Sequence, residues 1–270
     1  MAKAGEAAPG AARPLVLERV RKMDTAVNLS NSGQVMRAQV AACTRLLNMA
    51  GILHYSGHVS VRVPGKEQLY IQSREQSRAE VTPDSILLVD FDGNVVEGDD
   101  KPPSELVIHT EIYRARADVG AVVHNHMELA TAVTLAKGAE VKIMDFHAVR
   151  WASGVPVMRE VGHIKTKADG EALARALGDA DALLLRGHGL VLTSESAPAI
   201  LADTNHFQDN LKAMKEALSF SSELEPLTAE DLARVQKFMD RDHHIAKMWN
   251  YYVNEGRKSG VIPEDWEVTL

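Results

Sequence analysis

Apolar side chains recur at helical spacing in several stretches of the chain. Between residues 34 and 50, Met36, Val40, Cys43 and Leu47 lie three or four positions apart, and Gly51 follows as a stop signal. This spacing predicts a helix with one buried face. Similar patterns predict further helices near residues 102–116, 129–136, 170–177, 198–218 and 229–252.

Strand patterns lie between these helices. Residues 58–63 and 69–72 alternate polar and apolar, whereas 86–91, 120–123, 182–185 and 190–193 are short apolar runs typical of buried strands. Asp92-Gly93 follows one such run and favours a hairpin, hence antiparallel pairing with the next run. Strands and helices alternate without internal repeats, so we predict an α/β fold in which helices cover a mixed central sheet.

Composition narrows the class of protein. The chain has 270 residues, of which 45% are hydrophobic and 25% charged, which suits one main domain. Its net charge is −7 and its lysines and arginines are scattered among acids, so we expect no nucleic-acid partner. No apolar run approaches membrane-spanning length, and we expect no membrane partner. A lone cysteine, Cys43, fits a reducing cytoplasm.

The chain divides into three expected regions. Residues 1–30 begin with an Ala-, Gly- and Pro-rich stretch and are expected to form a flexible tail and lead-in. Residues 31–220 are expected to form the main domain. Residues 221–270 are expected to form a helical extension that packs on this domain or on a neighbouring subunit.

Three histidines at strand ends are candidate metal ligands. His124 and His126 are separated by one residue, so in an extended backbone both imidazoles project to the same side. His188 lies between two glycines in a turn after another apolar run, where the backbone can bend sharply. Three histidines would leave coordination positions open for a substrate. Taken singly, each motif is more often structural.

Glu105 is the fourth candidate. It lies in the first turn of the helix that Pro102-Pro103-Ser104 opens, where the helix dipole favours a carboxylate. Acids are common at helix starts, so Glu105 alone does not indicate function. Its role depends on whether it meets the three histidines.

Four segments together resemble the class II aldolase/adducin family. They follow one another in the family's order and spacing and extend over residues 34–218. The segments are Ser56-Gly57-His58-Val59-Ser60-Val61-Arg62, Pro103-Ser104-Glu105, Gly120-Ala121-Val122-Val123-His124-Asn125-His126 and Leu184-Leu185-Arg186-Gly187-His188-Gly189-Leu190.

The resemblance implies a fold and a cofactor. The fold is a three-layer α/β/α arrangement with a mixed, largely antiparallel central sheet, which makes residues 31–220 the catalytic domain. The cofactor is one divalent ion per subunit, typically zinc, on His124, His126 and His188. Manganese, iron and cobalt suit the same donors. The glutamate at position 105 would coordinate the ion at rest and shuttle protons in catalysis.

The resemblance also implies an assembly and favours an enzyme. Members form ring-like homotetramers with active sites at subunit interfaces. Adducins share the fold but lack the metal histidines, which this chain has. A metal-dependent lyase is therefore expected, and the alternative is a non-catalytic, adducin-like interaction module in which the histidines are only structural.

The chain departs from the sugar-phosphate aldolases where they bind phosphate. His58 replaces an asparagine in a Gly-Asn-x-Ser stretch, Ser73-Arg74-Glu75 replaces a Thr-Gly turn, and Pro103 replaces the first serine of a Ser-Ser pair. Several neutral donors are lost, so a sugar phosphate is not the expected substrate. Arg74 and His58 would instead suit a carboxylate, since arginine binds one through two parallel hydrogen bonds.

Other residues are expected on the substrate side of the pocket. The segment Phe146 to Trp151 and the later His163 combine aromatic and cationic groups, which suits a flat anionic ligand. The alternative for Phe146 and Trp151 is simple packing. The aromatic residues near the C-terminus, Trp249, Tyr251 and Tyr252, either cap a neighbouring site or pack. The expected substrate contacts are His58, Ser60, Arg74, Ser104, His147, Arg150, Trp151 and His163.

These features resemble family branches that decarboxylate hydroxylated aromatic or heteroaromatic dicarboxylates. We therefore expect decarboxylation, with Arg74 or Arg150 on the second carboxylate and Glu105 or a nearby histidine as proton donor. The alternative is an aldolase that cleaves or forms a hydroxyketone or hydroxyaldehyde adduct. Both reactions break a carbon–carbon bond and leave charge that an ion can absorb.

Overall fold

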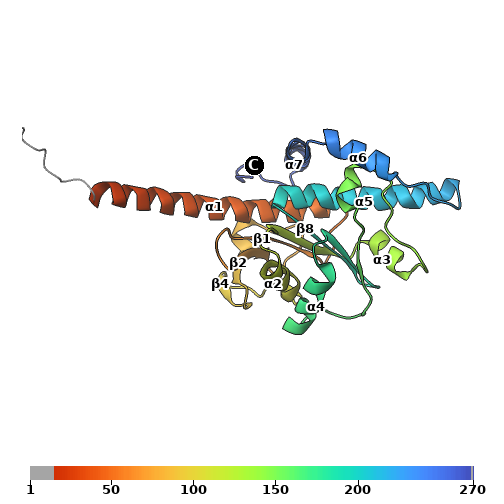
Figure 1. Ribbon diagram of the computed structural model, residues 1–270. Coiled ribbons are helices and arrows are strands. Elements are labelled where there is room, and N and C mark those ends of the chain that lie inside the picture. Colours follow the sequence, from red (N-terminus) through yellow and green to blue (C-terminus); the bar gives the residue numbers. More distant parts are fainter. Residues whose placement is uncertain (1–14, 269) are drawn as a thin grey trace, which may run out of the picture.

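The computed structural model describes residues 15–268 and 270, with side chains from residue 32 onward (Figure 1). Residues 1–14 of the expected tail lie outside the described residues. Helix α1 begins at Leu15 and runs to Met49, so it covers the remainder of that region and the helix predicted over 34–50.

One sheet forms the centre of the molecule. Its order is β4-β3-β2-β1-β5-β8-β7-β6, and every neighbouring pair is antiparallel except β6 and β7. The strands are β1 (His58–Arg62), β2 (Gln68–Gln72), β3 (Ile86–Asp90), β4 (Val95–Glu97), β5 (Ala121–Asn125), β6 (Val157–Met158), β7 (Ala182–Leu185) and β8 (Gly189–Ser194). The prediction of a mixed, largely antiparallel sheet is confirmed, including the Asp92-Gly93 hairpin between β3 and β4.

Helices cover both faces of this sheet, which makes three layers (Figure 1). One face carries α2 (Leu106–Ala115) and α4 (Lys167–Leu177). The other carries α1 and α5 (Ala197–Phe220), with α3 (Glu128–Leu135) beside them. The C-terminal helices α6 (Ala229–Phe238) and α7 (Arg241–Lys258) pack outside α5 (Figure 1). Two short 3-10 helices complete the chain, η1 (Pro83–Ser85) and η2 (Phe146–Trp151).

The two-sided cover explains why polar strand residues are buried. Val59 and Val61 of β1 face α1 and α5, whereas the alternating His58 and Ser60 face α2. All of these side chains are at most 8% exposed. Polar groups that are buried in this way need hydrogen-bond partners, and the face under α2 supplies them.

One predicted helix is divided in two. The stretch 229–252 was expected to be continuous, but α6 ends at Phe238 and α7 begins at Arg241. The Asp240 side chain accepts a hydrogen bond from the backbone N–H of His243 and so acts as the N-cap of α7. Apolar spacing continues across the break, which is why periodicity alone missed it.

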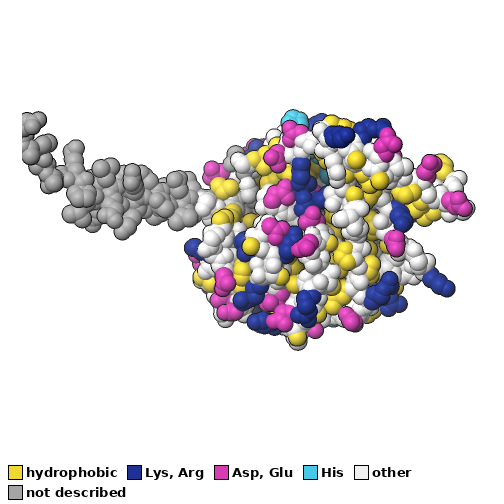
Figure 2. Space-filling model, in the orientation of Figure 1, with side chains coloured by type: hydrophobic (Ala, Val, Ile, Leu, Met, Phe, Trp, Pro, Cys, Tyr) yellow, Lys and Arg dark blue, Asp and Glu magenta, His cyan; other side chains and the backbone are white. Residues whose placement is uncertain are grey.

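No helix among the described residues combines the length and the apolar character that crossing a membrane requires. On the face shown in Figure 2, acidic and basic side chains are interspersed and form no basic stripe.

Candidate metal centre

Four side chains converge at one end of strands β5 and β8. They are those of Glu105, His124, His126 and His188, and one donor atom from each lies within 4.8 Å of the others. These are the four residues singled out from sequence as metal ligands. Three imidazole nitrogens and a carboxylate oxygen at such separations can surround one divalent ion.

Strand β5 and the residue that follows it supply two of the histidines. His124 lies near its end, directly opposite His58 of β1 on one side and Val191 of β8 on the other. His126 follows immediately after the strand, two residues further on, so its ring returns to the side of His124. The ring centroids of His124 and His126 are 5.1 Å apart.

The turn between β7 and β8 supplies His188. Gly187 has a φ of +65°, a conformation that L-residues with a side chain rarely adopt. At Gly189, an added Cβ would lie 2.1 Å from the carbonyl oxygen of Asn125, so only glycine lets the turn approach β5 this closely. The His188 ring lies 5.0 Å from that of His124, measured between centroids.

Glu105 enters from the opposite layer. It occupies the N-cap position of α2, one residue before the helix, rather than the first turn as expected. Its side chain makes no capping hydrogen bond; Oε1 accepts one from the backbone N–H of Ile164 at 3.1 Å. Its oxygens lie 3.5 Å from Nε2 of His124 and 3.6 Å from Nε2 of His188. The carboxylate therefore faces the histidines instead of the helix end.

The donor set fits a metal ion. His124 donates its Nδ1–H to the carbonyl of Leu190 at 3.0 Å, which leaves the Nε2 lone pair free. Nδ1 of His126 is hydrogen-bonded to Ser56 Oγ at 2.9 Å. Nε2 of both rings is buried and has no hydrogen-bond partner. Buried polar atoms rarely lack a partner, and a bound cation would provide one for both nitrogens.

The charge states suit cation binding at neutral pH. Burial, together with the neighbouring His124 and His188, lowers the pKa of His126 to about 4. Burial opposes ionisation of Glu105, but the imidazoles of His124 and His188 outweigh it and hold the pKa of that carboxyl well below its usual range. The centre therefore presents a carboxylate and at least one neutral imidazole.

A second set of polar groups lies behind the cluster, under α2. Nδ1 of His58 is 2.6 Å from Nε2 of His109, and Nδ1 of His109 is 2.6 Å from Ser60 Oγ. Ser60 Oγ is in turn 2.8 Å from the hydroxyl of Tyr113. The His58 and His124 rings are 5.2 Å apart. His58 and Ser60 were expected near the site, and both lie beside it.

His109 and Tyr113 were missed in the sequence. Both lie on α2 at helical spacing after Glu105, so they project from the same face of the helix. Periodicity placed a buried face there but could not show that its polar members meet strand β1.

The remaining candidates near the centre are exposed. His163 lies at its mouth, with Nδ1 3.9 Å from Glu105 Oε1 and 72% of its side chain exposed. Ser104 is exposed directly before Glu105. Arg74 follows β2; its side chain is 47% exposed, and its Nε lies 3.4 Å from Glu75 Oε1.

Three of the expected substrate contacts lie away from the candidate metal centre of their own chain. His147 stacks on His206 of α5. Trp151 is buried on the α5 side of the sheet against Phe207, as in the packing alternative. Arg150 lies near Asp181, Asp203 and Glu195, beyond the far end of β8 from His188, and the length of that strand separates them by about 20 Å.

Two of the three C-terminal aromatic residues pack within their own chain. Trp249 is buried and donates its indole N–H to the carbonyl of Val268 at 2.8 Å. Tyr252 is hydrogen-bonded to Asn205 of α5 at 2.8 Å, whereas Tyr251 is exposed. These contacts attach α7 to the domain.

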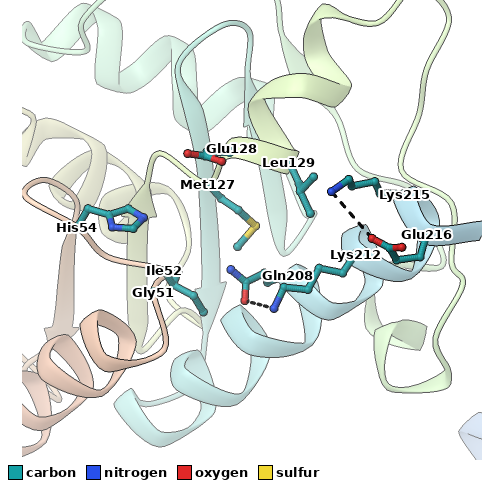
Figure 3. A pocket seen from close by; sticks show the side chains of 10 residues that line it. All are labelled: Gly51, Ile52, His54, Met127, Glu128, Leu129, Gln208, Lys212, Lys215 and Glu216. Carbon is teal, nitrogen blue, oxygen red and sulfur yellow. Dashed lines mark hydrogen bonds and ion pairs between the residues drawn. The ribbon is translucent and has the colours of Figure 1, made fainter. Parts of the chain in front are cut away.

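A cleft of about 400 Å³ is lined in part by residues that are close in sequence to those of the candidate metal centre (Figure 3). Its lining includes His54, two residues before Ser56, and Met127, which directly follows His126. Lys212 and Lys215 of α5 close the other side and are matched there by Gln208 and Glu216 (Figure 3). None of the four candidate metal ligands lines this cleft.

Comparison with known proteins agrees with this geometry. The chain is 34% identical over 174 residues to 3,4-dihydroxyphthalate decarboxylase of Arthrobacter keyseri, covering 59% of this chain and 69% of that protein. It is 29% identical over 230 residues to human beta-adducin, covering 82% of this chain and 31% of that protein. The crystal structure of an aldolase II superfamily protein from Pseudomonas syringae superposes with a TM-score of 0.75 and 27% identity, over 85% of this chain and 94% of that one. A family model gives the assignment. Residues 38–214 match the model described as Class II Aldolase and Adducin N-terminal domain. The chain belongs to the class II aldolase and adducin family.

Proposed function

We propose that this protein is a metal-dependent carbon–carbon lyase that decarboxylates a hydroxylated aromatic or heteroaromatic dicarboxylate. The observation that carries the proposal is the converging set of Glu105, His124, His126 and His188, in which two buried ring nitrogens, Nε2 of His124 and of His126, have no hydrogen-bond partner. A carboxylate held against three imidazoles is suited to an ion and to proton transfer at the same place.

The histidines would hold the ion through Nε2. When bound, a divalent ion supplies positive charge that absorbs the electron pair left by carbon–carbon cleavage. The protein holds the rings in place through their other nitrogens, since Nδ1 of His124 is fixed on Leu190 and that of His126 on Ser56. We propose zinc as the ion; manganese, iron and cobalt accept the same donors.

Glu105 would move the proton. Its Oε1 is fixed by the backbone N–H of Ile164, and both oxygens lie between 3.5 and 3.9 Å from imidazole nitrogens of His124, His188 and His163. An ionised carboxylate in this position can accept a proton from a substrate hydroxyl and return it to the carbon that loses its carboxyl group.

The substrate class rests on what surrounds the cluster. His58 stands beside His124 where sugar-phosphate members have an asparagine, which favours a carboxylate over a phosphate. The similarity to 3,4-dihydroxyphthalate decarboxylase supports the same class. Arg74 would anchor the second carboxylate, since its guanidinium is half exposed and contacts only the neighbouring Glu75 among the described carboxylates. Arg150 is set aside as an anchor because carboxylates of its own chain surround it.

Aldol cleavage of a hydroxyketone adduct is the alternative, because the same donors would serve it. The two are distinguished by purifying the protein, measuring its bound metal, and assaying CO2 release from 3,4-dihydroxyphthalate and related dicarboxylates against cleavage of hydroxyketone adducts. CO2 release that a chelator abolishes and zinc restores supports the proposal. Cleavage of aldol adducts without CO2 release would overturn it.

Arg74→Ala adds a test of the substrate class. It should raise KM for a dicarboxylate at least tenfold and leave KM for a neutral hydroxyaldehyde unchanged. Arg159→Ala, on the strand-end segment after β6, is a control for the loss of one exposed arginine charge. Equal effects of Arg74→Ala on both substrates would count against the carboxylate anchor.

We further propose a cytoplasmic homotetramer with active sites at subunit interfaces and a small anionic substrate. Membership of the family supports the assembly, and the exposed mouth at His163 leaves room for a neighbouring chain to complete the pocket. Sedimentation of the zinc-loaded protein tests the assembly, and a monomer with full activity would contradict it.

A further inference from the structure

A buried chain of hydrogen bonds leads away from the candidate metal centre. It runs from His58 to His109, then to Ser60, and ends at the hydroxyl of Tyr113, with successive separations of 2.6, 2.6 and 2.8 Å. All four residues are at most 4% exposed. No water can therefore substitute for a missing partner within the chain, and each proton has to find its acceptor among these groups.

The direction of donation along these hydrogen bonds follows from the last group, the Tyr113 hydroxyl. The Tyr113 hydroxyl is hydrogen-bonded to Ser60 Oγ and to the backbone of Val122. The Val122 N–H can only donate, so among the described residues Ser60 Oγ is the one acceptor for the Tyr113 O–H. If Ser60 donated to Tyr113 instead, the buried phenol proton would be left without an acceptor, which is unfavourable. Tyr113 therefore donates to Ser60, and the Ser60 hydroxyl proton points to Nδ1 of His109.

The same reasoning passes through the two rings. Burial lowers the pKa of His109 to about 3, so this ring is neutral and carries one proton. Its Nδ1 accepts from Ser60, and its proton is thus on Nε2, from which it donates to Nδ1 of His58. Nδ1 of His58 is then an acceptor, and the proton of His58 lies on Nε2, the ring nitrogen that has no partner among the described residues.

We propose that the chain of Tyr113, Ser60 and His109 fixes His58 in the Nε2–H tautomer, so that His58 donates a hydrogen bond to an anionic oxygen of the ion-bound substrate. The ligand class is a carboxylate or an oxyanion. His109, Ser60 and Tyr113 are positioning residues in this arrangement. The inference rests on the proposed function and deepens it: it assigns the tautomer and the donor atom of His58, one of the expected substrate contacts, and adds His109 and Tyr113 as positioning residues.

This arrangement explains why a fourth nearby histidine is not a ligand. The His58 and His124 rings lie 5.2 Å apart on directly opposed strand positions, yet His58 is not one of the four converging donors. A nitrogen that carries a proton has no lone pair to give to an ion. His58 therefore leaves the ion to the other three rings and offers its N–H to whatever anion binds there.

The tautomer can be observed directly. In zinc-loaded protein with 15N-labelled imidazoles, two-bond 15N–1H correlation spectra distinguish Nε2–H from Nδ1–H. We expect His58 and His109 to be pure Nε2–H. Tyr113→Phe removes the O–H that sets the direction and should produce a mixture at His58, whereas Tyr55→Phe, at a residue that is 90% exposed, should not. An Nδ1–H signal for His58 in the parent protein, or an unchanged spectrum in Tyr113→Phe, would overturn the proposal.

Binding of a simple dianion tests the role of the N–H. With oxalate as the probe and zinc-loaded protein, calorimetry should show at least tenfold weaker binding for His58→Leu, whereas His58→Gln retains an N–H donor and most of the affinity. Zinc content should stay at one per chain in both variants. Loss of zinc in His58→Gln, or equal oxalate affinity in His58→Leu and the parent, would overturn the proposal.

If His58→Leu fails to fold, Tyr113→Phe serves in its place and should weaken oxalate binding by several fold. These readouts do not depend on turnover. A protein with the expected tautomer and oxalate binding but no CO2 release would contradict the proposed decarboxylation and leave the role of His58 intact.

Discussion

Oε1 of Glu105 lies 3.6 Å from Nε2 of His188, although one residue precedes a helix on one side of the sheet and the other lies in a turn between two strands. Their meeting places a carboxylate against an imidazole at the point where His124 and His126 also converge. Neither residue indicates a metal site by itself. Because they lie close together, a role in metal binding can be tested at each of them.

Removing one imidazole should remove the ion. His188→Ala deletes one of three nitrogen donors and exposes the other two, so we expect bound zinc to fall from about one per chain to a small fraction. Atomic absorption after dialysis measures this. His54→Ala, an exposed histidine of the neighbouring cleft, is the matched control and should retain zinc. Full zinc content in His188→Ala would mean that the cluster is not the metal centre.

Replacing the carboxylate should separate metal binding from catalysis. Glu105→Gln keeps the shape of the side chain but cannot shuttle a proton, so kcat should fall by about 10²–10⁴-fold at saturating zinc. The comparison uses rates normalised to measured metal content. An unchanged kcat would exclude Glu105 from proton transfer, whatever its effect on zinc affinity.

Arg241 holds helix α7 on the domain. Its guanidinium donates two hydrogen bonds of 2.8 Å to the buried Asp203 and two, of 2.9 and 3.1 Å, to Glu195. Arg241→Ala should lower the free energy of unfolding by about 2 kcal/mol, because the buried Asp203 carboxylate would keep only the Ser194 hydroxyl and the more distant Arg150 as partners. Urea unfolding measures the loss. Arg234→Ala, which breaks an exposed pair on α6, should cost less than about 0.5 kcal/mol, and equal losses would contradict the assignment.

The free energy of unfolding should fall in mild acid because of a group of three histidines away from the metal centre. His147, His206 and His244 stack between η2, α5 and α7, and burial together with the other two rings lowers the pKa of His206 to about 4. Asp145 and Asp203 face the same group and oppose this shift. The unfolded chain binds a proton at His206 near pH 6.5, before the folded chain does, so stability is full above pH 6.5 and declines as the pH falls toward 4.

The expected decline from His206 is at most about 3 kcal/mol, and less after solvent screening. Urea unfolding of the parent and of His206→Gln at several pH values between 7 and 4 measures it. The variant lacks the titrating group and should show a flatter profile. Parallel profiles would show that His206 does not contribute.

The local features of this protein follow from its sequence. Apolar periodicity predicted the strand that carries His124 and the helix that follows Glu105, because side chains repeat every two residues in a strand and about every 3.6 in a helix. The one-residue gap between His124 and His126 predicted that both rings share a side, and the structure places them so. The mixed, largely antiparallel sheet was predicted from alternating strands and helices and from the family resemblance, and it is confirmed.

Only the tertiary structure decided which distant groups meet. Arg150 and Arg74 were both candidate carboxylate anchors, yet Arg150 lies among carboxylates beyond the far end of β8, whereas Arg74 lies half exposed in the loop after β2. In the sequence, His109 is one polar residue on a predicted helix and has no sign of a partner. In the structure, strand β1 places Nδ1 of His58 2.6 Å from Nε2 of His109. Spacing along the chain reports periodicity within one element, whereas these contacts depend on strand register and on how α2 packs against the sheet, which involve residues far apart in sequence.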